Sequence, residues 1–250
     1  MANLSLFKTQ ENTAEFNIDL FGMKDVYDEM RIAKTEVGGE VHYRAKVAAG
    51  GGKSFEISTG NEETDVSVQT IAGIIVHNHK CNAYFDEDAV GNSPPICSSM
   101  DGECGLNKST GEINQCKECI LNEYGSSSKG AGKACKNMHR LYILTEGCAI
   151  PIALSLPPSS LKGWQNYRMS VLAMKKLKPH EVVTEFTLTA VTSPLGHKYS
   201  VVKFKLLGRL NDETKQIAGL FAQDVTKTTA AITGEDYNRL APGKPEDISA

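Results

Sequence analysis

The sequence lacks the segments that would carry a chain into or across a membrane. Residues 1–10 have neither the basic start nor the long apolar run of a signal peptide. No stretch approaches the roughly 18 consecutive apolar residues of a membrane-spanning helix. With 40% hydrophobic and 23% charged residues, the composition is that of an ordinary globular protein. We therefore expect a cytosolic protein with no membrane partner.

Known catalytic motifs are also missing. The run from Gly50 to Ser54 resembles the end of a phosphate-binding P-loop, but Val47 occupies the position of the motif's first glycine. A strand-like segment, residues 55–58, follows where the motif requires a helix. The sequence contains no nucleophile elbow, no HExxH zincin motif and no dinucleotide fingerprint. We expect a turn at the glycines, and a protein that is not an enzyme.

Charge is distributed unevenly, although the whole chain carries only −3. Residues 151–210 contain nine basic residues against Glu181 and Glu185, and so carry +7, which leaves −10 for the rest. This asymmetry favours a basic binding surface on an acidic body; chance clustering on a solvated face is the alternative. The nine bases are Lys162, Arg168, Lys175, Lys176, Lys178, Lys198, Lys203, Lys205 and Arg209.

Cysteine clustering is the strongest chemical signal in the chain. Five of the seven cysteines fall within 39 residues: Cys97, Cys104, Cys116, Cys119 and Cys135. Because a reducing cytosol disfavours structural disulfides, clustered cysteines there indicate metal binding. The surrounding residues, 82–132, are poor in apolar side chains, and a loop of that length needs something other than a hydrophobic core to hold it.

The spacing of these cysteines indicates zinc. Cys116 and Cys119 form a Cys-x-x-Cys pair, whose thiolates can bind one Zn²⁺ from a tight turn. Cys97 and Cys135 flank the pair and complete a four-cysteine set, with Cys104 as a competing ligand. Four thiolates leave no open coordination position, so the site would be structural rather than catalytic. The alternative, a thioredoxin-like redox pair, lacks its usual strand-to-helix context here.

A second group, His77, His79 and Cys81, alternates along an expected strand and would share one strand face. These side chains could bind a metal. We favour the plainer interpretation, polar residues on the outer face of a strand whose inner face carries Ile74 and Val76.

Hydrophobic patterns predict short strands around few helices. We expect strands over residues 41–47, 55–58, 66–79, 141–144, 150–156, 182–191 and 199–207, and helices near 23–34, 160–178 and 211–225. Ser159 is the expected N-cap of the middle helix. Its expected core-facing stripe consists of Leu161, Trp164, Tyr167, Val171, Met174 and Leu177.

The order of strands, helix and final hairpin predicts a mainly β, α+β protein: an OB-fold-like β-barrel with an inserted zinc-binding loop module. Residues 37–210 would form the core, with the module inserted at about 82–139 and the third strand within 141–156. Residues 1–36 would form an N-terminal segment. A C-terminal helix over 211–225 and a flexible tail over 226–250 would follow.

The final hairpin supplies the expected nucleic-acid surface. Lys203 and Lys205 share a strand face with Tyr199, so the lysines could neutralise phosphates while the ring stacks on a base. The full set of expected contact residues is Tyr84, Phe85, Tyr124, Lys175, Lys176, Lys178, Lys198, Tyr199, Lys203 and Lys205. For each aromatic residue in this set, ordinary packing is the alternative.

Five short segments carry a resemblance: 95–102 (PICSSMDG), 116–119 (CKEC), 132–135 (GKAC), 141–144 (LYIL) and 156–161 (LPPSSL). Together they resemble bacteriophage and mobile-element proteins associated with single-stranded DNA binding, which combine a β-rich core with a cysteine zinc module. The resemblance covers roughly residues 71–210. It implies Cys97, Cys116, Cys119 and Cys135 as ligands of a structural Zn²⁺, whereas Cys104 does not fit the pattern. It also implies the cytoplasm of a bacterial host.

The expected function is therefore sequence-tolerant binding of single-stranded DNA in phage replication or recombination, with replication or recombination proteins as further partners. The alternative is a protein-interaction factor, such as a phage recombination directionality factor or an inhibitor of a host enzyme. A zinc enzyme would need an open metal position. The sequence sets neither the oligomeric state nor the preference between DNA and RNA.

Overall fold

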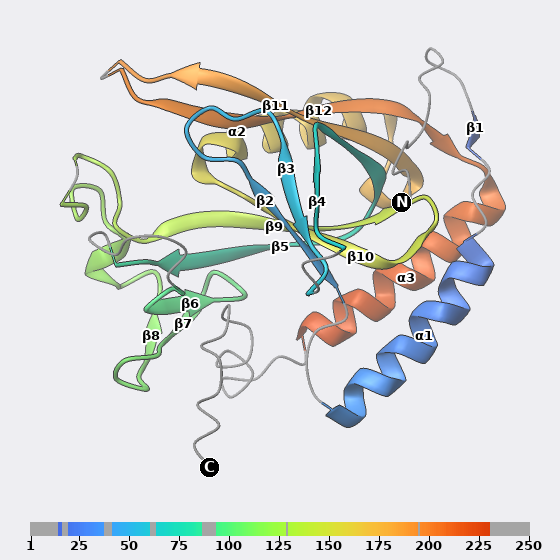
Figure 1. Cartoon of the computed structure of the whole chain (residues 1–250), viewed down its shortest axis with the longest axis horizontal. Helices are drawn as coiled ribbons and strands as arrows, with labels where there is room; N and C mark the ends of the chain where they lie inside the picture. Colours follow the sequence, from blue (N-terminus) through green and yellow to red (C-terminus); the bar gives the residue numbers. More distant parts are fainter. Residues whose placement is uncertain are drawn as a thin grey trace. The chain divides into compact units, whose positions relative to one another are not determined.

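The computed structural model of this protein describes residues 15–16, 20–37, 42–60, 64–86, 94–128, 130–194 and 196–230 (Figure 1). The chain divides into two compact units, Met1–Asn78 with Arg140–Lys227 and His79–His139 with Thr228–Ala250. The described part of the second unit covers nearly the same residues as the expected zinc module, about 82–139. Most of the expected tail, residues 231–250, lies outside the described residues.

The described elements are mainly strands with three α-helices, so the protein belongs to the α+β class. The strands are β1 Glu15–Phe16, β2 Tyr43–Val47, β3 Phe55–Ser58, β4 Val66–Val68, β5 Thr70–Tyr84, β6 Cys97–Ser99, β7 Cys104–Asn107, β8 Ile113–Gln115, β9 Lys136–Thr145, β10 Cys148–Leu156, β11 Val182–Thr192 and β12 Lys198–Leu210. The α-helices are α1 Leu20–Val37, α2 Pro158–Asn166 and α3 Asp212–Ala230.

An open mixed sheet forms the centre of the first unit, with strand order β1-β12-β11-β5-β9-β10-β2-β3-β4. β1 pairs in parallel with β12 and β2 with β10, whereas β11 pairs antiparallel with β12 and β5. The strands expected over 141–144 and 150–156 are present as β9 and β10, and they are two strands of the sheet rather than the single third strand of a barrel. The described strands do not show the closed five-stranded barrel of an OB-fold.

The sheet is nevertheless curved, so that the turn between β2 and β3 contacts the hairpin of β11 and β12. The turn between β2 and β3 contains Gly51, where an added Cβ would lie 3.3 Å from the Cβ atoms of Ala190 and Lys198. Beside it, the Ser200 hydroxyl donates to the Gly52 carbonyl oxygen at 2.8 Å. The triple glycine therefore forms a turn, as the sequence predicts, and this turn closes against the β11–β12 hairpin.

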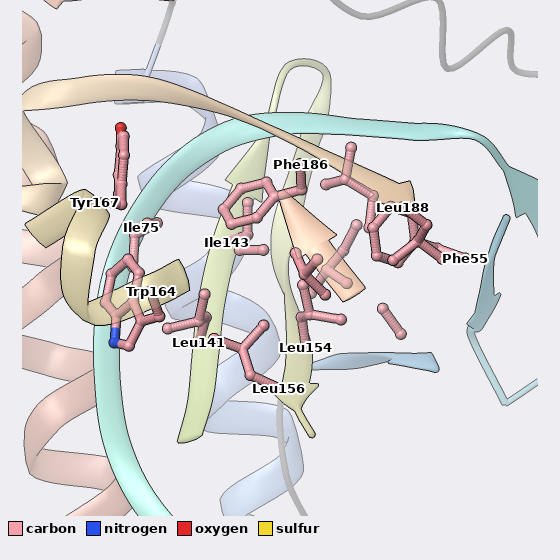
Figure 2. Packing of buried hydrophobic residues seen from close by; sticks show 14 of the residues in the cluster. Phe55, Ile75, Leu141, Ile143, Leu154, Leu156, Trp164, Tyr167, Phe186 and Leu188 are labelled. Carbon is pink, nitrogen blue, oxygen red and sulfur yellow. The ribbon is translucent and has the colours of Figure 1, made fainter. Parts of the chain in front are cut away.

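Two hydrophobic clusters cover the sheet, one on each face. In β9, Leu141 and Ile143 belong to the first cluster, while Tyr142 and Leu144 belong to the second. Alternate side chains of a strand point to opposite faces, so β9 is buried on both. Trp164 and Tyr167 belong to the first cluster, and Figure 2 shows them on the same side of it as Ile75.

The second cluster lies under two neighbouring helices, α1 and α3 (Figure 1). The rings of Tyr27 and Phe221 lie 5.3 Å apart, and Lys24 forms an ion pair with Asp224 at 2.8 Å. α3 begins after Asn211, whose side-chain oxygen accepts a hydrogen bond from the Thr214 N–H at 2.8 Å, as an N-cap does. No helix among the described residues is long and apolar enough to cross a membrane.

α3 also extends beyond the expected helix end. Residues 226–230 are helical, so the prediction of a tail beginning at Thr226 is wrong. The reason is packing, because Phe221 and Val225 are buried in the second cluster and hold the following turn in helical conformation.

The start of α2 differs from the prediction. Its N-cap is Pro157, with Pro158 at the first helical position, and no side-chain cap is present. Proline fits there because its φ angle is already helical and no N–H is needed. Ser159 is therefore not the cap; it is exposed and its hydroxyl donates to the Ser200 carbonyl oxygen at 3.4 Å.

The predicted apolar stripe of this helix holds except at Met174, since Leu161, Val171 and Leu177 also pack against the first cluster. Trp164 and Tyr167 are 3% exposed, but Met174 is 79% exposed and Leu172 takes an inward position. From Tyr167 to Leu172 the backbone is π-helical, and such a turn is wider than an α-turn, so it shifts the side chains that follow out of phase. Met174 is thus not a core residue.

Candidate metal centre and nucleic-acid surface

Four cysteines of the second unit line one small cavity. Cys97 lies in β6, Cys116 directly after β8, Cys119 before a short 3₁₀ turn and Cys135 directly before β9. The cavity has a volume of about 20 Å³. A space of this size holds one water-sized group, so it also suits a single ion.

A strand face separates Cys104 from the other four thiols. In β7, Gly105 faces them: a Cβ built there would lie 3.0 Å from the Cys97 Sγ and 3.5 Å from the Cys116 Sγ. Neighbouring residues of a strand point to opposite faces, so Cys104 points away. Its sulfur instead accepts a hydrogen bond from the Gln115 side chain at 3.3 Å. The competing ligand suggested by the sequence is therefore not among the gathered thiols.

Backbone hydrogen bonds hold the loops that carry the thiols. The Cys116 N–H donates to the Glu103 carbonyl oxygen at 2.7 Å, and the side-chain amide of Asn122 donates to the Cys116 carbonyl oxygen at 2.7 Å. The Cys135 N–H donates to the Leu121 carbonyl oxygen at 2.8 Å. The last contact ties the segment carrying Cys135 to the loop that follows the Cys-x-x-Cys pair.

An amide network beside the cavity was not identified from the sequence. The Asn137 side chain donates to the side-chain oxygens of Asn82 and Asn122, both at 2.9 Å. The Lys133 ammonium donates to the side-chain oxygens of Asn122 and Asn137 at 3.2 and 3.1 Å, and lies 5.1 Å from the centre of the Tyr124 ring. Asn82 and Asn137 are 55 positions apart, and amides at such separation carry no recognisable spacing.

The electrostatics of the cavity disfavour thiolates in the absence of a cation. Burial raises the pKa of Cys97, and the neighbouring Cys116 and Cys119 raise it further. Burial, followed by the charge of the other three thiolates, raises the pKa of Cys135 to about 12. A bound divalent cation would reverse this balance, because coordinated thiols lose their protons.

The donor set fits zinc, but the coordination geometry is not closed. Within the described residues, no group of three or more His, Cys, Asp or Glu side chains meets the geometry for holding a metal ion. The four sulfurs are gathered around one cavity without being drawn into tetrahedral coordination. The common cavity thus groups all four cysteines, and the contacts of Gly105 place the Cys97 and Cys116 sulfurs near each other.

The predicted basic strand face is formed by β11 and β12. In the antiparallel register, Lys205 lies opposite Glu185, and Lys203 opposite Thr187. Tyr199 lies opposite Val191 further along the same hairpin. Directly paired residues share a sheet face, so these side chains line one surface, on which Tyr199, Lys203 and Lys205 are exposed.

Helices α1 and α3, which pack on the second cluster, do not cover the hairpin between Tyr199 and Lys205. Leu207, two residues beyond Lys205 on the same strand face, is buried in the second cluster. Tyr199 is 36% exposed, and Lys198 beside it is also exposed. The surface therefore begins where the packing against α3 ends.

Other expected contact residues lie apart from this face in the chain. Lys175, Lys176 and Lys178 are exposed at the end of the helical segment after α2, where Lys176 has a left-handed φ of 56°. Tyr84, Phe85 and Tyr124 belong to the second unit. Tyr84 lines the cysteine cavity, Phe85 is 36% exposed and Tyr124 is 83% exposed.

The group His77, His79 and Cys81 makes separate contacts. His77 hydrogen-bonds to the Thr226 hydroxyl at 2.9 Å, and the ring of His79 donates to the Lys80 carbonyl oxygen at 2.8 Å. Cys81 is buried, at 2% exposed, so it does not lie on an outer strand face as the plainer interpretation predicts.

No protein-family model, curated protein or solved structure matches this chain. Function is therefore inferred from the residues and their placement alone.

Proposed function

We propose that this protein binds single-stranded DNA without strong sequence preference, using the exposed face of β11 and β12, in phage DNA replication or recombination. The observation that carries the proposal is the register of this hairpin. It aligns Tyr199, Lys203 and Lys205 on one exposed surface with Thr187 opposite. An aromatic ring among spaced cations is the arrangement by which sequence-tolerant proteins hold a single strand.

Salt dependence should distinguish the lysine–phosphate contacts from base stacking on Tyr199. Each lysine that neutralises a phosphate releases counterions, which makes binding steeply dependent on salt. A base stacked on Tyr199 contributes about 1–3 kcal/mol, with little dependence on salt. Glu185 opposite Lys205 lowers the local positive potential, so Lys203 should contribute more than Lys205.

Fluorescence anisotropy with a labelled oligo-dT across a salt series tests the proposal. The double variant K203Q/K205Q should flatten the slope of log affinity against log salt by about 1.4, because each single-strand phosphate contact contributes about 0.7. Tyr199→Ala should weaken binding by about 5- to 150-fold at every salt concentration. Lys46→Gln removes an exposed strand lysine outside this face and should change neither quantity.

The absence of oligo-dT binding even at low salt, from folded protein, would refute DNA binding. That outcome would favour the alternative of a protein-interaction factor.

The second part of the proposal is a structural zinc held by Cys97, Cys116, Cys119 and Cys135. Its support is the common cavity that these four thiols line and the exclusion of Cys104 from it. Neither hydrophobic cluster includes a described residue of the second unit, so zinc would take the place of such a core there and would supply folding free energy rather than reactivity. We assign it no catalytic role.

Metal analysis of the purified protein should give one zinc per chain. Cys119→Ser should lose the metal and make the second unit sensitive to protease, because three thiolates leave the coordination open. Cys104→Ser is the matched control and should retain zinc. Equal loss from both variants would show that the ligand set is wrong.

We further propose that the curved sheet serves as an OB-like binding surface in the cytoplasm of a bacterial host. The contact of the β2–β3 turn with the β11–β12 hairpin supports this curvature. Extended single strands commonly follow curved sheet surfaces of this kind.

A further inference from the structure

The lining of the cysteine cavity contains nothing that would offset the charge of a bound metal complex. Zn²⁺ held by four thiolates carries two net negative charges. Among the described residues that line the cavity there is no lysine, arginine or histidine, whereas the side chains of Asn82, Asn114 and Asn122 are present. Removing a charged complex from water is costly unless nearby groups offset its charge. A compensating cation would therefore lie behind this lining.

Lys133 is such a cation, and three contacts hold its ammonium. The ammonium donates to the side-chain oxygens of Asn122 and Asn137 at 3.2 and 3.1 Å. It also lies 5.1 Å from the centre of the Tyr124 ring. An ammonium group has three N–H donors, so these contacts can use all of them. The side chain is half-buried, whereas that of Lys117, beside the ligand Cys116, is exposed.

The hydrogen bonds around Lys133 fix the direction of the amide groups. The Asn122 amide nitrogen donates to the Cys116 carbonyl oxygen at 2.7 Å. The Asn137 amide nitrogen donates to the side-chain oxygens of Asn82 and Asn122, both at 2.9 Å. Both nitrogens are engaged as donors, so the two oxygens are turned toward the ammonium. Because Asn122 lines the cavity, the ammonium is held one side chain behind it.

The same network joins the segments that carry the thiols. Asn122 lies three positions after Cys119. Asn137 lies two positions after Cys135. The third amide, Asn82, belongs to β5, which pairs with β6, the strand of the remaining flanking cysteine. Holding the ammonium in place therefore also holds these segments around the cavity.

The charge of Lys133 acts on at least one of the thiols. Burial raises the pKa of Cys135 to about 12, and the other three cysteines add to this increase, whereas the positive charge of Lys133 acts in the opposite direction. A charge that favours the thiolate also favours the metal complex, because zinc binds the deprotonated sulfur.

We propose that Lys133 is a positioning residue of the zinc site: its ammonium, held by the amide oxygens of Asn122 and Asn137, offsets the negative charge of the four zinc-bound thiolates. This inference rests on the zinc site of the proposed function and adds to it a residue that is not a ligand. Removing a group that supports metal ligands from outside typically lowers metal affinity by about 10- to 100-fold.

Zinc affinity, measured by competition with a chromophoric chelator, tests this role. Lys133→Met keeps an unbranched side chain but removes the ammonium, and it should weaken zinc binding by about tenfold. Lys133→Arg retains the charge and should recover most of this loss. Lys117→Met is the matched control, because it removes an exposed charge next to a ligand. It should change the affinity by less than about twofold, since solvent and salt screen that charge.

Two further measurements separate the effect of the charge from a loss of structure. Lys133→Met loaded with Co²⁺ should keep the absorption bands of four thiolate ligands, because the ligand set is unchanged. In the background of Asn137→Ala, Lys133→Met should have a smaller effect on zinc affinity, because the ammonium has already lost one of the groups that hold it.

Three outcomes would overturn the inference while the wild-type protein still binds zinc. These are wild-type affinity in folded Lys133→Met, equal losses in Lys133→Met and Lys133→Arg, and equal losses in Lys133→Met and Lys117→Met. A wild-type protein that binds no zinc would instead refute the zinc site itself, and this role with it.

Discussion

Replacing Gly105 by alanine tests whether the gathered thiols close around a metal. The new methyl group would lie 3.0 Å from the Cys97 Sγ, closer than ordinary contact, and 3.5 Å from the Cys116 Sγ, which is ordinary contact. The consequence depends on whether the Cys97 sulfur can move. In the metal-free protein its side chain can rotate away, whereas a zinc bond of about 2.3 Å would fix it.

The magnitude follows from two opposing effects. Alanine in a strand is more favourable than glycine by about 0.5–1 kcal/mol, because the unfolded chain loses less freedom. Overpacking against a fixed atom costs about 1–3 kcal/mol. The metal-free protein should therefore be unchanged or slightly more stable. The zinc complex should lose about 1–3 kcal/mol, which corresponds to zinc affinity about 5- to 150-fold lower.

Competition with a chromophoric chelator measures the zinc affinity, and chemical denaturation measures the stability of the metal-free form. Substitution by Co²⁺ adds a spectroscopic count of the thiolate ligands. Gly132→Ala is the matched control, because its added Cβ meets no atom within 4 Å in the same unit. It should preserve zinc affinity.

Two results would refute this reasoning. If Gly105→Ala binds zinc as tightly as Gly132→Ala, Cys97 is not held beside Gly105 in the metal complex. If Gly105→Ala instead destabilises the metal-free protein by the full amount, the cavity is rigid without metal and zinc is not what fixes it.

Two further predictions concern the first unit. Ser160→Ala should lower the free energy of unfolding by about 1–3 kcal/mol, because the buried Ser160 hydroxyl accepts a hydrogen bond at 2.9 Å from a buried backbone N–H of β12. Denaturation with urea measures this, and the exposed Ser159→Ala should change stability by less than about 0.5 kcal/mol; equal effects would contradict the assignment. Burial lowers the pKa of His180 below its usual 6.5, Glu181 opposes the shift and Lys178 adds to it. Since the folded pKa is depressed, the associated stability is present above about pH 6.5 and is lost as the pH falls through the folded pKa. An NMR titration should show this low value, and Lys178→Gln should raise it; a pKa at or above 6.5 would refute the burial argument.

Local patterns predicted many elements well. β3 covers the expected residues 55–58, and the alternating segments near the C-terminal end of the first unit form the antiparallel hairpin of β11 and β12. The predicted sharing of one face by Tyr199, Lys203 and Lys205 is confirmed by their exposure and register. These features depend on side chains one or two positions apart, and strand geometry fixes that relation.

Predictions that depended on distant contacts were less successful. Strand order along the chain suggested a barrel, but neighbours in a sheet are chosen by packing between remote segments, and the described strands form an open mixed sheet. Helix periodicity after Tyr167 predicted a buried Met174, but the π-helical turn moved it outward. No nearby residue signals such a turn.

The cysteine segment shows most clearly which features depend on the sequence alone and which depend on the tertiary structure. The sequence by itself determined that thiols cluster and that hydrophobic burial cannot organise residues 82–132, because spacing and composition are local properties. Only the tertiary structure decided which thiols meet, since the pairing of β6, β7 and β8 sets Gly105 toward Cys97 and Cys116 and turns Cys104 away.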